Sequence, residues 1–89
     1  MRMLVLIPAY NEAQNLPQVV ANVRQHVPDA DILIVDDASC DATPSLLPKL
    51  GVRWVRLSQR LGTGTAVRTG LRYAASRGYE MVVRIDGDG

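Results

Sequence analysis

The run Met-Leu-Val-Leu-Ile, residues 3–7, decides which kind of fold this chain can adopt. An unbroken apolar run of this length is typical of a β-strand that is covered on both faces, as strands are in a parallel sheet. A second buried strand is predicted at Asp31–Val35, a partly exposed one at Val52–Leu57, and a fourth at Met81–Ile85. Pro8 is expected to end the first strand.

Helical segments lie between the predicted strands. After Asn15, a plausible N-cap, apolar residues recur at i, i+3, i+4, i+7 and i+11, which indicates an amphipathic helix. A short helix is predicted after Thr43, and a longer one between a glycine-bearing loop, Ser58–Thr65, and Gly78. Strands that alternate with helices at this spacing predict an α/β fold with a parallel sheet and right-handed crossovers.

Composition restricts the classes of partner. The length of 89 residues suits one small domain, and 47% hydrophobic residues is typical of a globular protein. A net charge of +1 gives no reason to expect nucleic acid or an anionic membrane as a general partner. Cys40 is the single cysteine, so no intrachain disulfide can form and a reducing cytoplasm is expected. The opening apolar run is too short for a signal peptide or a membrane span, so any contact with the inner face of a membrane is expected to come from other parts or partners.

Polar residues follow every predicted strand at its carboxyl end. They are Tyr10, Asn11 and Glu12 after the first strand, Asp36, Asp37, Ser39 and Asp41 after the second, Gln59 and Arg60 after the third, and Asp86 and Asp88 after the fourth. In open α/β sheets, ligands bind beyond the carboxyl ends of the strands. This coincidence predicts a binding site at that edge of the sheet.

Asp86 and Asp88 are the candidate metal ligands. Residues i and i+2 of an extended chain lie on the same side, so these two carboxylates can converge on one cation. Carboxylate oxygens are preferred by hard divalent ions such as Mg²⁺ and Mn²⁺. Gly87 and Gly89 remove side chains where a ligand approaches the backbone. An ordinary polar turn after a strand is the alternative interpretation, because Asp-Gly is a common turn dipeptide.

The glycines of the third connection do not form a known nucleotide motif. The dinucleotide pattern GxGxxG fails because Val67 takes the place of the third glycine after Gly62 and Gly64, and the P-loop pattern fails because no Gly-Lys-Ser/Thr exists. The loop still opens a helix, so its amides could face a phosphate. A flexible connection that needs glycine for a positive φ is the alternative.

The charged residues near this loop also allow two interpretations. Arg60 could contact a diphosphate as a permanent cation with planar donors, or it could be a solvated arginine. Asp36 and Asp37 are adjacent carboxylates that repel each other, so they need donors such as a ribose hydroxyl, a base N–H or nearby amides. Capping of the helix region at Thr43 is the alternative for this pair.

Four ordered motifs span the whole chain. They are Ile7-Pro8-Ala9-Tyr10-Asn11-Glu12; Ile34-Val35-Asp36-Asp37-Ala38-Ser39-x-Asp41-x-Thr43; Arg60-Leu61-Gly62-x-Gly64-Thr65-Ala66-x-x-x-Gly70-Leu71; and Asp86-Gly87-Asp88-Gly89. Together they resemble the amino-terminal half of the inverting family-2 glycosyltransferases of GT-A fold. Within that family, the dolichyl- or polyprenyl-phosphate mannose and glucose synthases are the most similar branch.

The resemblance implies a fold, a donor and an acceptor. The fold is a Rossmann-like GT-A nucleotide-sugar-binding half, with about four parallel strands in the order 3-2-1-4 and helices on both faces. The donor is a GDP- or UDP-linked hexose bound with Mg²⁺ or Mn²⁺ at Asp86 and Asp88. The acceptor is a polyprenyl phosphate or another glycan or lipid.

The resemblance also implies residue roles. The positions that match the nucleotide-sugar site are Pro8, Ala9, Tyr10, Glu12, Val35, Asp36, Asp37, Arg60, Asp86, Gly87 and Asp88. The first motif would hold the base and ribose, and the second would add further base or ribose contacts. Arg60 would lie near the phosphates. The Asp86–Asp88 motif would meet the ribose and the metal on the diphosphate.

The chain departs from the family pattern in two ways. Ala38 stands where the family usually has glycine, a mild change if φ is negative there. The family's catalytic base and acceptor half follow the last motif, so no catalytic residue is assigned. We therefore expect residues 1–89 to be a partial domain that transfers no sugar and self-associates through an exposed edge of the fourth strand. A non-catalytic nucleotide-binding module, or a truncated remnant of the same fold, is the main alternative; a sugar-phosphate nucleotidyltransferase fits less well, because its glycine-rich loop follows strand one.

Overall fold

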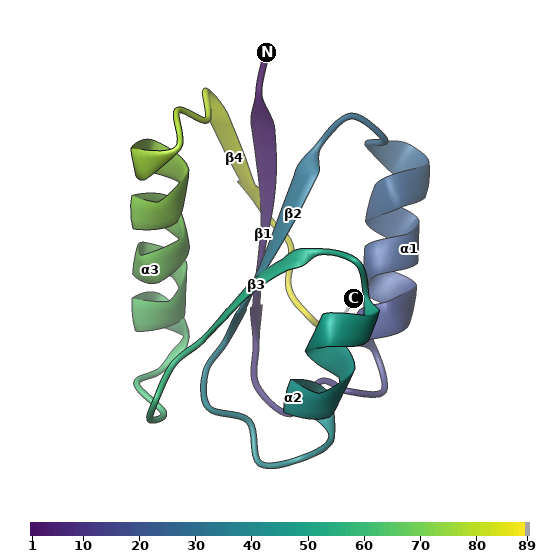
Figure 1. Cartoon of the computed structure of the whole chain (residues 1–89), viewed down its shortest axis with the longest axis vertical. Helices are drawn as coiled ribbons and strands as arrows, with labels where there is room; N and C mark the ends of the chain where they lie inside the picture. Colours follow the sequence, from purple (N-terminus) through teal and green to yellow (C-terminus); the bar gives the residue numbers. More distant parts are fainter. Residues whose placement is uncertain (89) are drawn as a thin grey trace.

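The computed structural model describes residues 1–88 and contains one four-stranded sheet (Figure 1). Its elements are β1 (Met3–Ala9), α1 (Leu16–His26), β2 (Asp31–Asp36), α2 (Thr43–Leu46), a 3-10 helix η1 (Leu47–Lys49), β3 (Arg53–Arg56), α3 (Thr63–Ser76) and β4 (Met81–Arg84). The strand order is β3-β2-β1-β4 and every pair is parallel. The predicted sheet and its strand order are confirmed. Across residues 1–88, none of the helices has the length and apolar character needed to cross a membrane.

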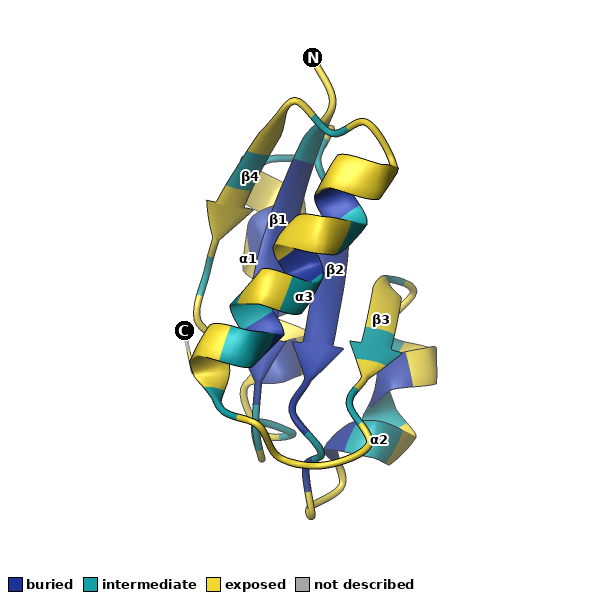
Figure 2. Ribbon diagram, turned by 90° about the vertical axis from the view of Figure 1, so that its left-hand side faces the viewer, coloured by how far each residue is buried: buried dark blue, intermediate teal, exposed yellow. Residues whose placement is uncertain are grey.

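Helices cover both faces of the sheet, as predicted. In Figure 1, α3 lies on one side of the strands and α1 and α2 lie on the other. Figure 2 shows that β1 and β2 are buried between these layers, whereas β3 and β4 at the two edges are largely exposed. The central strands therefore supply the continuous apolar runs, because both of their faces are covered.

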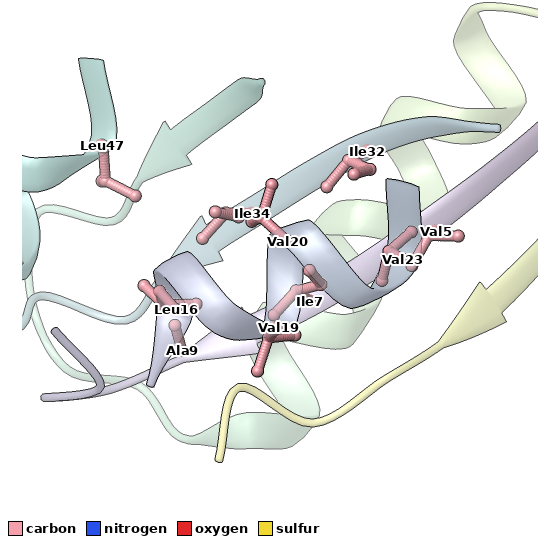
Figure 3. Close-up of a cluster of buried hydrophobic side chains, with 10 residues drawn as sticks. All are labelled: Val5, Ile7, Ala9, Leu16, Val19, Val20, Val23, Ile32, Ile34 and Leu47. Carbon is pink, nitrogen blue, oxygen red and sulfur yellow. The ribbon is translucent and has the colours of Figure 1, made fainter. Parts of the chain in front are cut away.

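Alternation along the strands divides the interior into two clusters. The cluster on the α1 side consists of Val5, Ile7, Ala9, Leu16, Val19, Val20, Val23, Ile32, Ile34 and Leu47 (Figure 3). The cluster on the α3 side consists of Leu4, Leu6, Leu33, Val35, Ala66 and Ala74. Successive strand residues point to opposite faces. The same rule sends Asp36, the last residue of β2, and Asp37, which follows it, in opposite directions.

The first strand is longer than expected, because it runs through Pro8 to Ala9. In a parallel strand, the backbone N–H and C=O of one residue point to the neighbouring strand on one side, and those of the next residue point to the strand on the other side. The carbonyl of Leu6 accepts the N–H of Ile85 on the β4 side, and the carbonyl of Ala9 accepts the N–H of Asp37 on the β2 side. Pro8 therefore turns its nitrogen toward the β4 side, beyond the last pairing with β4 at Leu6. A missing N–H is tolerated there, since no ladder bond is lost.

The last helix begins earlier than expected, at Thr63. The predicted loop Ser58–Thr65 is therefore too long at its carboxyl end. Gly62 is the N-cap with φ +97°, a backbone conformation that favours glycine. Asn15 occupies the N-cap of α1 as predicted, but its side chain donates to Glu12 instead of capping the helix.

Ala38 has φ +58°, so the expectation of a mild change at a negative φ does not apply. At a position in the left-handed region, a residue with a side chain costs roughly 1–2 kcal/mol of stability. Glycine avoids this strain but costs about 0.5–1 kcal/mol, because it loses more conformational freedom on folding. We expect Ala38→Gly to raise the free energy of unfolding by about 0.5–1 kcal/mol in urea titration. Ala21→Gly, on the exposed side of α1, should lower it by about 1 kcal/mol. A loss of stability in both variants would contradict this account of Ala38.

Candidate functional site

An open cavity of about 330 Å³ lies at the carboxyl ends of β1, β2 and β4, beside the start of α3. Its lining residues are Pro8, Ala9, Tyr10, Glu12, Asp37, Arg60, Thr63, Ala66, Arg84, Asp86, Gly87 and Asp88. Most residues that the motifs single out are thus brought together on the α3 side of the sheet. Two are not: Val35 and Asp36 are completely buried and do not line the cavity.

Asp37 anchors the loop that precedes α3. One of its carboxylate oxygens accepts the N–H of Leu61 at 2.8 Å, and the other accepts the N–H of Gly62 at 2.9 Å. The Arg60 guanidinium lies 3.8 Å from the same carboxylate. Asp37 is 3% exposed, so its charge is held by these donors instead of by water. Its position therefore fixes the loop that carries Arg60.

Arg60 lies flat against Tyr10. The guanidinium carbon is 3.6 Å from the centre of the ring, which is the geometry of a cation–π contact. The charged end of Arg60 is thus held over the cavity between Tyr10 and Asp37. The Arg60 side chain is also 54% exposed, so it is solvated as well as positioned at the cavity, and both interpretations of Arg60 are compatible with this arrangement.

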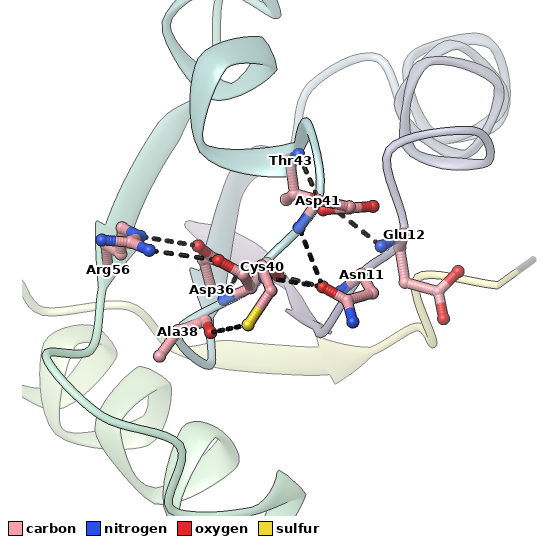
Figure 4. A network of polar contacts seen from close by, with 9 residues as sticks. Asn11, Glu12, Asp36, Ala38, Cys40, Asp41, Thr43 and Arg56 are labelled. Atoms are coloured by element: carbon pink, nitrogen blue, oxygen red, sulfur yellow. Dashed lines mark hydrogen bonds and ion pairs between the residues drawn. The ribbon is translucent and has the colours of Figure 1, made fainter.

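Asp36 serves the opposite face, where it organises the second loop (Figure 4). It accepts hydrogen bonds from Ser39, and its other oxygen lies 3.2 Å from Nε of Arg56. The side-chain oxygen of Asn11 accepts the N–H groups of Cys40 and of the next residue. The bonds of Asn11 join the loops after β1 and β2, and those of Asp36 fix the loop after β2 to the end of β3.

Asp41, not Asp36 or Asp37, is the carboxylate at the start of α2. It accepts the N–H of Thr43 at 2.8 Å and that of Ala13 at 3.3 Å. Burial acts to raise the pKa of Asp41, but the hydrogen bonds from Thr43 and Ala13 outweigh it and leave this pKa below its ordinary value. The alternative of capping by the Asp36–Asp37 pair is therefore wrong: the N–H of Thr43 donates to Asp41, whereas Asp36 and Asp37 accept hydrogen bonds from other residues.

The loop after β4 brings Asp86 and Asp88 to the cavity wall. Asp86 is paired with Arg84, whose Nε and Nη2 each lie 3.2 Å from one oxygen of that carboxylate. Gly87, between Asp86 and Asp88 in the chain, is buried. A Cβ at Gly87 would lie 3.3 Å from both Glu12 Cγ and the carbonyl oxygen of Pro8. Glycine therefore eases the close approach of this loop to the end of β1, since a larger residue would need its neighbours to shift by a few tenths of an ångström.

The donor chemistry of this loop fits a hard divalent cation only in part. Asp86 and Asp88 offer carboxylate oxygens, and Glu12 lines the same cavity. Within residues 1–88, no three acidic, histidine or cysteine side chains are grouped closely enough to hold a metal by themselves. Mg²⁺ is commonly bound through one or two carboxylates together with phosphate oxygens of a substrate. The residues present fit that kind of shared site.

The start of α3 forms one wall of the cavity through Thr63 and Ala66. No side chain of the described residues caps this end, and its first turn contains no acidic residue. Free N–H groups and the helix dipole favour an anion at such a position. Gly62 has the positive φ that the alternative interpretation of the loop required. The N–H groups of Leu61 and Gly62 donate to Asp37, so a phosphate would have to be bound by the N–H groups of the first turn of α3.

Sequence reasoning missed three lining residues: Thr63, Ala66 and Arg84. The first two were hidden by the late start assigned to α3. Arg84 could have been found, because the alternation that places Asp86 and Asp88 on one side also places Arg84 there.

A family model described as Glycosyl transferase family 2 matches residues 4–89. Two relatives are the undecaprenyl-phosphate mannosyltransferase of Micrococcus luteus, 37% identical over 100% of this chain, and the polyprenol monophosphomannose synthase of Mycolicibacterium smegmatis, 38% identical over 99%. The chain spans only 39% and 36% of the lengths of these two relatives.

The fold is also found in solved structures. The mannosyltransferase PcManGT from Pyrobaculum calidifontis, in complex with GDP-Man and Mn²⁺, superposes with a TM-score of 0.83 and is 32% identical over 98% of this chain and 27% of that one. Staphylococcus aureus TarS 1-349 in complex with UDP-GlcNAc gives a TM-score of 0.84 over 99% of this chain and 27% of that one; at 23% identity this likeness shows the fold alone. The four-stranded sheet is thus of the Rossmann-like GT-A type. Because the family model matches nearly the whole chain, the protein belongs to glycosyl transferase family 2.

Proposed function

We propose that this chain binds the nucleoside-diphosphate sugar of a glycosyltransferase, with a divalent cation, in the cavity at the carboxyl ends of β1, β2 and β4. The observation that carries the proposal is the charge of that cavity. Its lining contains four carboxylates, those of Glu12, Asp37, Asp86 and Asp88, and two guanidinium groups, which leaves a net charge of −2. A diphosphate would be repelled from such a surface unless a divalent cation entered with it.

The cavity offers a different environment at each of its sides. Arg60 and the uncapped start of α3 supply positive charge and free N–H groups, which suit the diphosphate. Pro8, Ala9 and Tyr10 at the end of β1, with Glu12, supply apolar and hydrogen-bonding surface for the base and ribose. We assign the nucleoside to this second side.

Asp37 would then act in two ways. It faces the cavity, and it also fixes Leu61 and Gly62 through both of its oxygens. Val35 and Asp36 are buried behind the cavity, so we propose that they support the base and ribose site from beneath its surface.

Asp86 and Asp88 would hold the cation, and the backbone at Gly87 lets the ligand approach closely. A divalent cation bound there would neutralise the nucleoside diphosphate as the glycosidic bond breaks. The solved relative with GDP-Man and Mn²⁺ supports this pairing of nucleotide and metal. The donor is therefore proposed to be a GDP- or UDP-hexose, and the metal Mn²⁺ or Mg²⁺.

The names of the relatives support a polyprenyl phosphate as the acceptor. We propose an inverting transfer that needs a base and an acceptor site beyond residues 1–89, so that these residues alone form a partial domain and transfer no sugar. Sugar transfer by the 89-residue chain would contradict this. A cytoplasmic location is part of the proposal, and the exposed thiol of Cys40 is consistent with a reducing compartment.

Nuclear magnetic resonance of the 89-residue chain can locate the ligand. Addition of GDP or UDP with Mg²⁺, which is diamagnetic, should shift the amide signals of residues 9–12, 60–66 and 84–88. A second cavity, at the opposite end of the sheet near residues 24, 51 and 53, provides an internal control whose signals should not move. Shifts confined to that second region, or no shifts with either nucleotide, would refute the proposed site.

We also propose that the 89-residue chain associates with a second copy of itself along β4. Among the described residues, β4 pairs only with β1, and Met81 and Val83 are 41% and 38% exposed. Unpaired N–H and C=O groups beside exposed apolar side chains are a template for edge-to-edge association. Val83→Lys should shift sedimentation toward the monomer. A monomeric wild-type chain at all concentrations would contradict this proposal.

A further inference from the structure

Arg84 is the one charged residue of the cavity that no motif predicted. It ends β4 and lies on the same face as Asp86, with which it makes two contacts of 3.2 Å. Its side chain is 50% exposed, so the guanidinium is not fixed by burial. The two residues that follow Asp86 in the chain, Gly87 and Asp88, carry no positive charge.

The second cation of the cavity, Arg60, has a similar exposure of 54%, but it has more partners. Arg60 is stacked on Tyr10 and lies beside the buried carboxylate of Asp37. Arg84 has only the exposed carboxylate of Asp86 as a recorded partner among the described residues. Exposed pairs of this kind are weak, so Arg84 can leave Asp86 at little cost.

We propose that Arg84 sets how strongly nucleotide binding depends on the divalent cation. This inference rests on the proposed function and adds a residue to it. Arg84 supplies half of the positive side-chain charge that lines the cavity, so it reduces the repulsion between the cavity and a diphosphate when no metal is present. The same charge beside Asp86 opposes the binding of a divalent cation to that carboxylate.

The expected changes in nucleotide affinity and in metal affinity have opposite signs, whereas damage to the fold would weaken both affinities. Arg84→Gln should weaken the binding of GDP or UDP in EDTA, because the cavity loses a positive charge. It should also tighten the binding of Mn²⁺ alone, because the competing cation at Asp86 is gone. For a unit charge a few ångströms away at a solvated surface, each change should be about three- to tenfold.

The experiment measures both quantities on the 89-residue chain. Calorimetry gives the affinities for GDP and UDP in EDTA, and the electron paramagnetic resonance signal of free Mn²⁺ gives the affinity for the metal alone. Arg84→Lys keeps the charge and should resemble the wild type in both. Arg72→Gln removes the same charge from the exposed face of α3, away from the cavity, and should change neither by more than about twofold.

Opposite shifts in Arg84→Gln, with Arg84→Lys close to the wild type, would support the inference. If both affinities weaken together, Arg84 only shapes the loop after β4, and the inference is wrong; it is also wrong if neither affinity changes. A wild-type chain that binds neither nucleotide, with or without Mn²⁺, would overturn the proposed function together with this inference. Normal nucleotide binding with an unaffected Arg84→Gln variant would overturn the inference alone.

Discussion

Asp88→Asn should reduce the affinity for GDP or UDP measured in the presence of Mn²⁺ by about 100-fold, the loss expected when a metal ligand is removed from a shared site. The substitution keeps the shape of the side chain and removes its negative charge. Asp88 is exposed on the cavity wall, so no buried partner is left unsatisfied by the change. In EDTA, the affinity should stay the same or rise slightly, because the cavity becomes less negative.

Isothermal calorimetry with each nucleotide, in Mn²⁺ and in EDTA, provides the comparison. Asp29→Asn is the matched control, since it removes an exposed carboxylate that lies after α1 and does not line the cavity. Its affinities should equal those of the wild type. Full Mn²⁺-dependent affinity in Asp88→Asn would show that this carboxylate does not hold the metal.

Gly70→Ala should destabilise the fold by about 1–3 kcal/mol, although alanine is the better helix former. A Cβ at Gly70 would lie 2.2 Å from one methyl carbon of Leu6 and 2.6 Å from the other. Leu6 is completely buried in the α3-side cluster, so it has no room to move away. Helix α3 would have to shift from the sheet.

Gly64→Ala is the matched control in the same helix. A Cβ at Gly64 meets nothing within 4 Å, so this variant should be unchanged or more stable by up to about 1 kcal/mol. Urea unfolding of both variants gives the difference. Equal stabilities for Gly70→Ala and Gly64→Ala would contradict the close contact between α3 and Leu6.

Much of the fold is predictable because the central strands are simple. The apolar runs at residues 4–7 and 32–35 are buried on both faces and fix the middle of the sheet. The errors fall where tertiary contacts decide the boundary. Pro8 continues β1 because its nitrogen faces a position with no ladder partner, and Thr63 starts α3 because Gly62 turns the chain immediately before it.

The site was predictable wherever position along a strand determines position in space. About half of the polar residues at the strand ends gather at one cavity, since parallel strands present their carboxyl ends together; the others, such as Asp36 and Asp41, do not line it. Their roles were less predictable. Asp36 and Asp37 are adjacent in sequence, so their side chains face opposite sides of the sheet. They therefore accept hydrogen bonds from different donors.

The central claim is that a cavity of net charge −2 binds a nucleoside diphosphate together with a divalent cation. Its most direct test is calorimetry of the wild-type 89-residue chain with GDP and with UDP, in Mn²⁺ and in EDTA. We predict that at least one nucleotide binds, and that its affinity is about tenfold or more greater in Mn²⁺. Binding of neither nucleotide, or equal affinity in Mn²⁺ and EDTA by a chain that unfolds cooperatively, would contradict the account.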